Sequence, residues 1–443
     1  MARRRRRRLP DEPVEVGISD LSHDGRGVGR IEEKVVFVHG ALPGERVSAR
    51  LVGRNRRFDE AVTLAVEAPS HERVEPECPW FGYCGGCALQ HLDHRAQLGW
   101  KQQRLKENLR RIGEVEPDEW MAPIFASPWN YRRRARLSAR NVPGKGRVLV
   151  GFREIGGRYV ADIEACRVLH PAFADRLMEL SSLIGSLSIP DRVAQVECAA
   201  GDDTAAIVLR HLEPLTSADE KTLVDWSDQT GIAVWLQSGG PDSVTRLWPA
   251  QHQLDYRLDD FGLTLDFHPQ QFIQVNAAVN RQLTARAVEL MDAGPDDRIL
   301  DLFCGLGNFS LPLATRAGEV LGAELDESLV RSAAHNAAAN GIGNAGFVAA
   351  DLMQSVDTLD WMQDAFHGVL IDPPRSGAAE ILPLVAATGA RTLVYVSCDP
   401  ATLARDAGTL TADFGYRLEK AGIADMFPHT AHVESLALFR KAA

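Results

Sequence analysis

Residues 298–310 read RILDLFCGLGNFS, and this stretch decides the fold of the second half of the chain. The run 298–303 is apolar enough for a buried strand, and the glycines of 304–308 predict a sharp turn into a helix that begins near Phe309. Glycines at such a turn allow the backbone to approach a ligand closely. Short apolar runs then alternate with helical windows, which predicts an open α/β domain over residues 268–443.

Polar residues follow the strands of this predicted sheet. EVLGAE ends in Glu324, FVAAD in Asp351 and GVLID in Asp372, and LVYVS is followed by Cys398. The carboxyl ends of strands in an open α/β sheet form the ligand crevice, so we expect the four side chains to line one site. The alternative is that each is an ordinary helix cap or turn residue, which explains any one of them easily but all four together poorly.

The same glycine turn indicates the cofactor. DLFCGLGNF lacks the third glycine of the dinucleotide fingerprint and carries Phe309-Ser310 there, which disfavours a nicotinamide enzyme. Glu324 lies nineteen residues beyond Gly305, about where a carboxylate accepts hydrogen bonds from a ribose. S-adenosylmethionine therefore fits better.

Cys398 is the candidate nucleophile. It stands at a predicted strand end beside Asp372, and Pro400 restricts the turn that presents it. Cys198 and Cys304 are expected to be inert core residues instead. Carbon-5 of uracil is a poor nucleophile, so its methylation requires prior covalent attack at carbon-6, for which a thiolate is well suited.

The proton on carbon-5 must then be removed by a general base, so that the cysteine can be expelled. Glu434 is our candidate, because the polar segment that contains it precedes the final strand SLALFRK and could return it to the sheet edge. His429 and His432 lie in the same segment and are competitors that sequence order alone does not exclude.

The N-terminal part of the chain has the pattern of a small β-barrel. Six consecutive arginines, Arg3–Arg8, predict a disordered arm over residues 1–10 that is either phosphate-binding or merely solubilising. Residues 11–69 alternate short β-rich runs with Gly and Pro turns. Through DGRGVGR, VFVHGALPGERV and the basic 54–58 segment, this stretch resembles the TRAM domain, an RNA-binding barrel of OB type.

The strand-like runs and Gly turns of residues 75–267 predict a central, β-rich α+β domain. It includes the helical run RAQLGWKQQRLKENLRRIG and the basic segment Asn130–Arg136, which suits base stacking with phosphate contact or the exposed face of a strand. Its start holds Cys78, Cys84 and Cys87, and Cys166 is a plausible distant fourth thiol. Four thiolates suit zinc or an iron–sulfur cluster equally.

DLFCGLGNFS, IDPPRSG, VSCDPATLARD and DMFPHTAHVES, with FIQVN upstream, are similar in order and spacing to the motifs of the bacterial RNA uracil-C5-methyltransferase family. With the barrel, the resemblance covers nearly the whole chain. It implies that Cys398 is the nucleophile and Glu434 the proton acceptor. It also implies a 4Fe-4S cluster on the four cysteines, with a structural or RNA-docking role. The implied cofactor contacts come from Gln274, Phe303, Asn308, Glu324, Asp351 and Asp372. At the position of Asp351 the family varies between Asn and Asp.

The chain has both the barrel and the cysteine cluster, and in this it resembles the family members that modify 23S ribosomal RNA at position 1939. The position label is taken from the family. An unpaired or flipped-out uridine is the expected target, because a stacked base hides carbon-6. Alternatives are the same chemistry on another rRNA or tRNA uridine, an amino-group methyltransferase, or a non-catalytic ribosome assembly factor. An amino-group methyltransferase would need no cysteine nucleophile. The intact glycine turn, nucleophile and candidate base argue against the non-catalytic assembly factor.

The bulk composition agrees with a multidomain globular enzyme. The chain has 443 residues, and 45% of them are hydrophobic. This length exceeds what one hydrophobic core usually serves, so we expect two or three domains. A net charge of −11 would disfavour RNA binding if the charge were evenly spread over the chain. The arginines are clustered, so basic patches can still bind RNA. No stretch suits a membrane span or signal core, so a cytoplasmic monomer without a membrane partner is expected.

Overall fold

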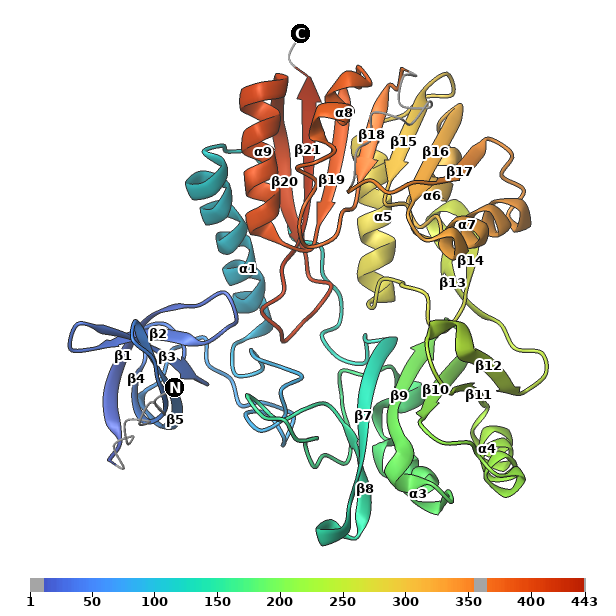
Figure 1. The fold of residues 1–443 in the computed structure, drawn as a ribbon. Coiled ribbons are helices and arrows are strands. Elements are labelled where there is room, and N and C mark those ends of the chain that lie inside the picture. The colour runs from blue at the N-terminus through green and yellow to red at the C-terminus, as the bar shows by residue number, and fades with distance from the viewer. Residues whose placement is uncertain (1–11, 354–364, 442–443) are drawn as a thin grey trace, which may run out of the picture. The chain divides into compact units, whose positions relative to one another are not determined.

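The computed structural model describes residues 12–353 and 365–441 (Figure 1). They group into two compact units. The first contains the described residues up to Gly99, with Phe152–Ile163 and Pro428–His432; the second contains Trp100–Gly151, Glu164–Phe427 and the residues from Val433 onward. The arm predicted over residues 1–10 lies outside the described residues, and the predicted domain boundaries stay predictions.

The first unit contains the predicted N-terminal barrel. Five strands close on each other in the order β1-β2-β3-β5-β4. Valine and isoleucine side chains at alternate positions fill it, and at Gly29 a Cβ atom would lie 2.4 Å from a Val16 methyl, so only glycine fits. The strands are β1 (Val14–Leu21), β2 (Gly27–Ile31), β3 (Lys34–His39), β4 (Arg46–Arg54) and β5 (Phe58–Ala68).

The second unit contains a six-stranded, mostly antiparallel sheet in the order β12-β11-β10-β9-β7-β8. Helices α3 and α4 pack against its strands β8 and β11. The elements are β7 (Arg134–Val142), β8 (Arg147–Gly151), α2 (Pro171–Ala174), α3 (Leu177–Ser186), β9 (Val193–Ala200), β10 (Ala205–His211), α4 (Ser217–Thr230), β11 (Ile232–Gln237) and β12 (Val244–Trp248). A separate hairpin follows, formed by β13 (Leu254–Leu258) and β14 (Leu263–Phe267).

The larger sheet of the second unit has eight strands in the order β17-β16-β15-β18-β19-β21-β20-β6. Strands β15 to β19 are parallel, as predicted, whereas β21 runs antiparallel to both β19 and β20. The strands are β6 (Glu119–Trp120), β15 (Arg298–Leu302), β16 (Glu319–Glu324), β17 (Ala345–Ala349), β18 (Gly368–Ile371), β19 (Thr392–Ser397), β20 (Tyr416–Ala424) and β21 (Glu434–Lys441).

Helices lie along both sides of this sheet (Figure 1). α5 contacts β18, β19 and β21, α7 contacts β16 and β17, and α9 contacts β19 and β20. No helix among the described residues is long and apolar enough to cross a membrane. The helices are α1 (His94–Asn108), α5 (Ala277–Met291), α6 (Ser310–Ala314), α7 (Glu327–Ala339), α8 (Leu382–Ala387) and α9 (Pro400–Phe414).

Candidate active site

The parallel register brings the predicted strand-end residues to one edge of the sheet. Leu302 at the end of β15 pairs with Ala323 of β16 on one side and with Ile371 of β18 on the other. The next residue, Phe303, therefore stands between the ends of β16 and β18, where Glu324 and Asp372 lie. The predicted strand-end residues Glu324 and Asp372 therefore lie at the same edge of the sheet.

The glycine turn after β15 has an unusual backbone. Phe303, Gly305 and Gly307 adopt φ angles of +65°, +57° and +96°. A bulky residue such as Phe303 rarely adopts a positive φ, and strain of this kind is typical of ligand sites. The Glu324 carboxylate accepts hydrogen bonds from the backbone N–H groups of Gly305 (3.1 Å) and Leu325 (2.8 Å), so the acidic residue is tied to the turn.

Two of the other predicted cofactor contacts, Asn308 and Asp351, follow β15 and β17 at this edge. Asn308 exchanges amide hydrogen bonds with Asn280 of α5 at 2.8 and 3.0 Å, and its Oδ1 accepts a further one from Tyr256. Asp351 follows β17 and accepts from the backbone of Met353 at 3.0 Å. Gln274 is half-buried in the segment that enters α5.

Cys398 and Glu434 are brought together by the antiparallel pairing of β19 with β21. Ser397 pairs with Ser435, so Cys398, one residue beyond β19, lies opposite Glu434, the first residue of β21. Cys398 is half-buried and Glu434 is only 4% exposed. His429, one of the competing bases, is a buried residue of the first unit, where Gln97 contacts both its backbone and its ring.

The charges around Cys398 act against its ionisation. Burial, followed by the carboxyl groups of Glu434 and Asp372, raises the pKa of the Cys398 thiol to about 11, and Arg375 opposes this shift. Burial raises the pKa of Asp372 to about 7. Burial also raises the pKa of Glu434 well above its usual range, with Asp372 adding to the shift and Arg375 lowering it.

Sequence reasoning missed two residues of this site. Asp301, on β15, is fully buried; its Oδ2 accepts a hydrogen bond from Ser310, while its Oδ1 has no partner. Burial raises the pKa of Asp301 to about 7. Arg375 influences both Cys398 and Glu434. The acidic residue before the glycine turn and the arginine of IDPPRSG were the available signals.

Two cysteines behave as predicted, since Cys198 and Cys304 are buried core residues. Cys78, Cys84 and Cys87 are half-buried cysteines of the first unit, and Cys166 is a half-buried cysteine of the second. Within residues 12–353 and 365–441, no group of three His, Cys, Asp or Glu side chains is placed to hold a metal ion. The donor chemistry fits an iron–sulfur cluster, but the structure does not gather three ligands.

Arginines of the basic segment after Asn130 form ion pairs with carboxylates of the protein itself. Arg133 is 5% exposed and its guanidinium binds Asp202 at 2.5 Å. Arg134 binds Glu197 at 3.4 Å, and Arg136 shares that carboxylate while its own side chain stays exposed. For Arg133 the interpretation as a phosphate contact is therefore wrong, because burial requires a carboxylate partner within the fold.

Comparison with known proteins connects this site to a family. Residues 251–442 match the tRNA (Uracil-5-)-methyltransferase model, and residues 8–60 match the TRAM domain. The chain is 51% identical over 441 residues to the 23S rRNA (uracil(1939)-C(5))-methyltransferase RlmD of Alkalilimnicola ehrlichii, and 47% identical to that of Xanthomonas campestris, covering 99% of each chain in both cases.

The fold has a solved counterpart as well. The Pyrococcus abyssi tRNA (uracil-54, C5)-methyltransferase, solved in complex with S-adenosyl-L-homocysteine, superposes with a TM-score of 0.74 at 24% identity, covering 96% of this chain and all of the other. The barrel and the methyltransferase fold predicted from the sequence are confirmed. Full-length relatives at half identity show the family: the chain belongs to the RNA uracil-C5-methyltransferases.

Proposed function

We propose that this chain transfers a methyl group from S-adenosylmethionine to carbon-5 of a uridine in 23S ribosomal RNA through a covalent cysteine–uracil adduct. The observation that carries the proposal is the register of β19 and β21, which sets Cys398 opposite Glu434 at the end of these strands. The RlmD relatives, named for uracil 1939, support the equivalent nucleotide as the target.

The two residues suit the two halves of the reaction. Cys398 attacks carbon-6 of the uracil as a thiolate, and the ring then becomes nucleophilic at carbon-5. Glu434 takes the carbon-5 proton after methyl transfer, and the electrons of that C–H bond restore the ring as the C–S bond breaks. A carboxyl whose pKa is raised by burial is a stronger base than an ordinary one, which suits this second role.

The residues of the crevice fit the cofactor. The buried, partnerless Oδ1 of Asp301 and the open space beside Gly305 leave room and an acceptor for a polar ligand. When bound there, S-adenosylmethionine supplies the methyl group as an electrophile. We assign its binding to the side chains predicted from the family motifs, namely Gln274, Phe303, Asn308, Glu324, Asp351 and Asp372.

We further propose that Cys78, Cys84, Cys87 and Cys166 hold a 4Fe-4S cluster. All four are half-buried cysteines, and cysteine thiolates are the donors of such clusters. Iron and acid-labile sulfide should be found in anaerobically purified protein and lost in Cys87→Ser. Zinc without iron would contradict this assignment.

The RNA is expected to contact the barrel. The basic segment between β4 and β5, residues 54–57, is exposed, as phosphate contacts require. We propose a cytoplasmic location, because the relatives are named for ribosomal RNA; the monomeric state stays a prediction.

Trapping on RNA that contains 5-fluorouridine tests the reaction, because fluorine cannot leave as a proton and the adduct persists. Wild-type protein and the core control Cys198→Ala should form an adduct that survives denaturation, and Cys398→Ala should form none. Mapping methylated uridines in 23S rRNA from cells that lack the protein tests the target. An adduct in Cys398→Ala would remove the assignment of the nucleophile.

A further inference from the structure

Helix α1 carries two polar side chains that are completely buried. Gln97 and Lys101, one helical turn apart, are both 0% exposed. Buried polar groups need hydrogen-bond partners, and removing water from a lysine is especially costly. Both side chains find partners in residues 425–433, here called the return segment, which connects β20 to β21.

Lys101 holds the first half of the return segment. Its Nζ donates to Asp425 Oδ1 at 2.6 Å and to the carbonyl oxygen of Phe427 at 2.9 Å. Neither Lys101 nor Asp425 has any exposed side-chain surface. The backbone N–H of Asp425 donates to the carbonyl of Ile124 at 2.8 Å, so this residue is held through both its side chain and its backbone.

Gln97 holds the second half, within the first unit. Its Oε1 accepts from the backbone N–H of His429 at 2.9 Å, and its Nε2 donates to the carbonyls of Leu89 and Leu92 at 3.0 and 2.8 Å. The His429 carbonyl accepts from the backbone of Ala88 and Leu89. His429 has a φ of +64°, a conformation that a histidine keeps only when its surroundings hold it there.

The return segment leads directly into the proposed base. Ala424 at the end of β20 pairs with Glu434 at the start of β21, so the segment begins and ends beside that carboxylate. Glu434 in turn lies opposite Cys398. A shift in the path of the return segment would therefore move the carboxyl group relative to carbon-5 of a uracil bound to Cys398.

We infer that Gln97 and Lys101 are positioning residues for the proton-removal step, which act by holding the return segment that presents Glu434. This rests on the proposed function, since it assumes Glu434 is the base. Misplacing a catalytic group by about 1 Å can cost roughly 10²-fold in rate. The inference predicts a defect confined to the second half of the reaction, after the thiol has attacked and the methyl group has moved.

Two variants remove these contacts while limiting damage to the fold. Gln97→Leu replaces the amide by an apolar group of similar shape, and the double variant Lys101→Met/Asp425→Leu replaces the whole ion pair, which proteins often tolerate. Gln103→Leu and Lys106→Met change more accessible positions of the same helix and serve as controls. Thermal unfolding of each variant shows which are folded.

The experiment follows two signals in a single turnover, with protein in excess over unmodified RNA that carries tritium at carbon-5 of uridine. Incorporation of labelled methyl reports attack and transfer, and tritium release reports removal of the proton. In the folded variants, the rate of methyl incorporation should stay within about threefold of wild type, and the rate of tritium release should fall by about tenfold or more. Complete loss of a general base typically lowers a rate by roughly 10²–10⁴-fold. The covalent adduct should accumulate, as in Glu434→Gln, and the controls should match wild type.

Equal slowing of both signals, or no adduct accumulation in a folded variant, would overturn the inference and leave a purely structural role. If the double variant does not fold, Gln97→Leu decides the question. Failure of the proposed function looks different, because wild-type protein would then form no adduct even on 5-fluorouridine RNA, and no base would be left to position.

Discussion

At the scale of single residues, the proposed first chemical step requires Cys398 to ionise. Its pKa of about 11 in the protein alone leaves about one thiol in 10⁴ ionised at pH 7, because the thiolate is disfavoured by burial and by neighbouring carboxyls. Alkylation of Cys398 by iodoacetamide should therefore rise about tenfold per pH unit from pH 7 toward 10, measured by mass spectrometry of its peptide.

The neighbouring arginine provides a control for that prediction. Arg375 lowers the pKa of the thiol, so Arg375→Ala should raise it further and slow alkylation at pH 9 by roughly two- to fivefold. A plateau of the alkylation rate near pH 8.5 would show instead an ordinary, unperturbed thiol.

At the scale of elements, the turn between β19 and α9 presents Cys398, the proposed nucleophile. Asp399 caps α9, since its Oδ1 accepts from the backbone of Ala401 at 2.9 Å and of Thr402 at 3.3 Å. Asp399→Ala should lower the free energy of unfolding by about 0.5–2 kcal/mol, measured in urea, because two backbone N–H groups lose their acceptor.

Adduct formation should also slow in Asp399→Ala, because the cap directly follows Cys398 and fixes its turn. Asp399→Asn keeps a capping oxygen and should retain most of both properties. Equal stability of the Ala and Asn variants would show that the cap contributes little.

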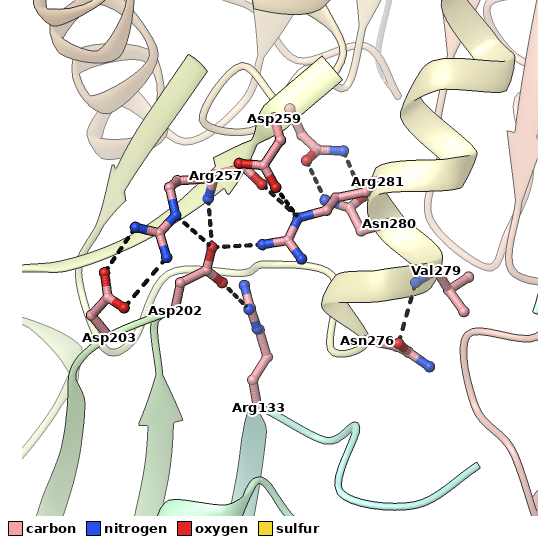
Figure 2. A network of polar contacts seen from close by, with 10 residues as sticks. Arg133, Asp202, Asp203, Arg257, Asp259, Asn276, Val279, Asn280 and Arg281 are labelled. Atoms are coloured by element: carbon pink, nitrogen blue, oxygen red, sulfur yellow. Dashed lines mark hydrogen bonds and ion pairs between the residues drawn. The ribbon is translucent and has the colours of Figure 1, made fainter. Parts of the chain in front are cut away.

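At the scale of the whole molecule, Asp202 joins several elements of the second unit (Figure 2). Its carboxylate accepts from Arg133 at 2.5 Å, from Arg281 of α5 at 2.7 Å and from the backbone of Arg257 in β13 at 2.9 Å. Asp202→Ala should cost about 3–5 kcal/mol in urea unfolding, because it leaves Arg133 buried without its counter-charge.

The adjacent Asp203 is the matched control. Its side chain is 67% exposed and pairs with Arg257 at the surface, as Figure 2 shows. Asp203→Ala should therefore change stability by at most about 1 kcal/mol. Similar losses in both variants would mean that burial does not govern the network.

The catalytic sheet was the most predictable part of the fold. Its strands were readable because buried parallel strands are short apolar runs, and EVLGAE coincides with β16 from its first residue to its last. The helical run after the cysteines was also correct and became α1. Its buried polar side chains were not foreseen, because a helical pattern reports local backbone conformation, and the Lys101 partner lies 324 residues away.

The sequence by itself predicted the barrel and the gathering of polar residues at the strand ends, and it proposed Cys398 as the nucleophile, because each inference depends on local patterns and on the rule that parallel strands end together. The tertiary structure supplied the pairing across the strands. Glu434 and His429 are five residues apart and equally polar in sequence; the β19–β21 register places Glu434 opposite Cys398, and Gln97 binds His429 within the first unit. Strand register and burial are set by contacts between distant segments, which local sequence does not contain.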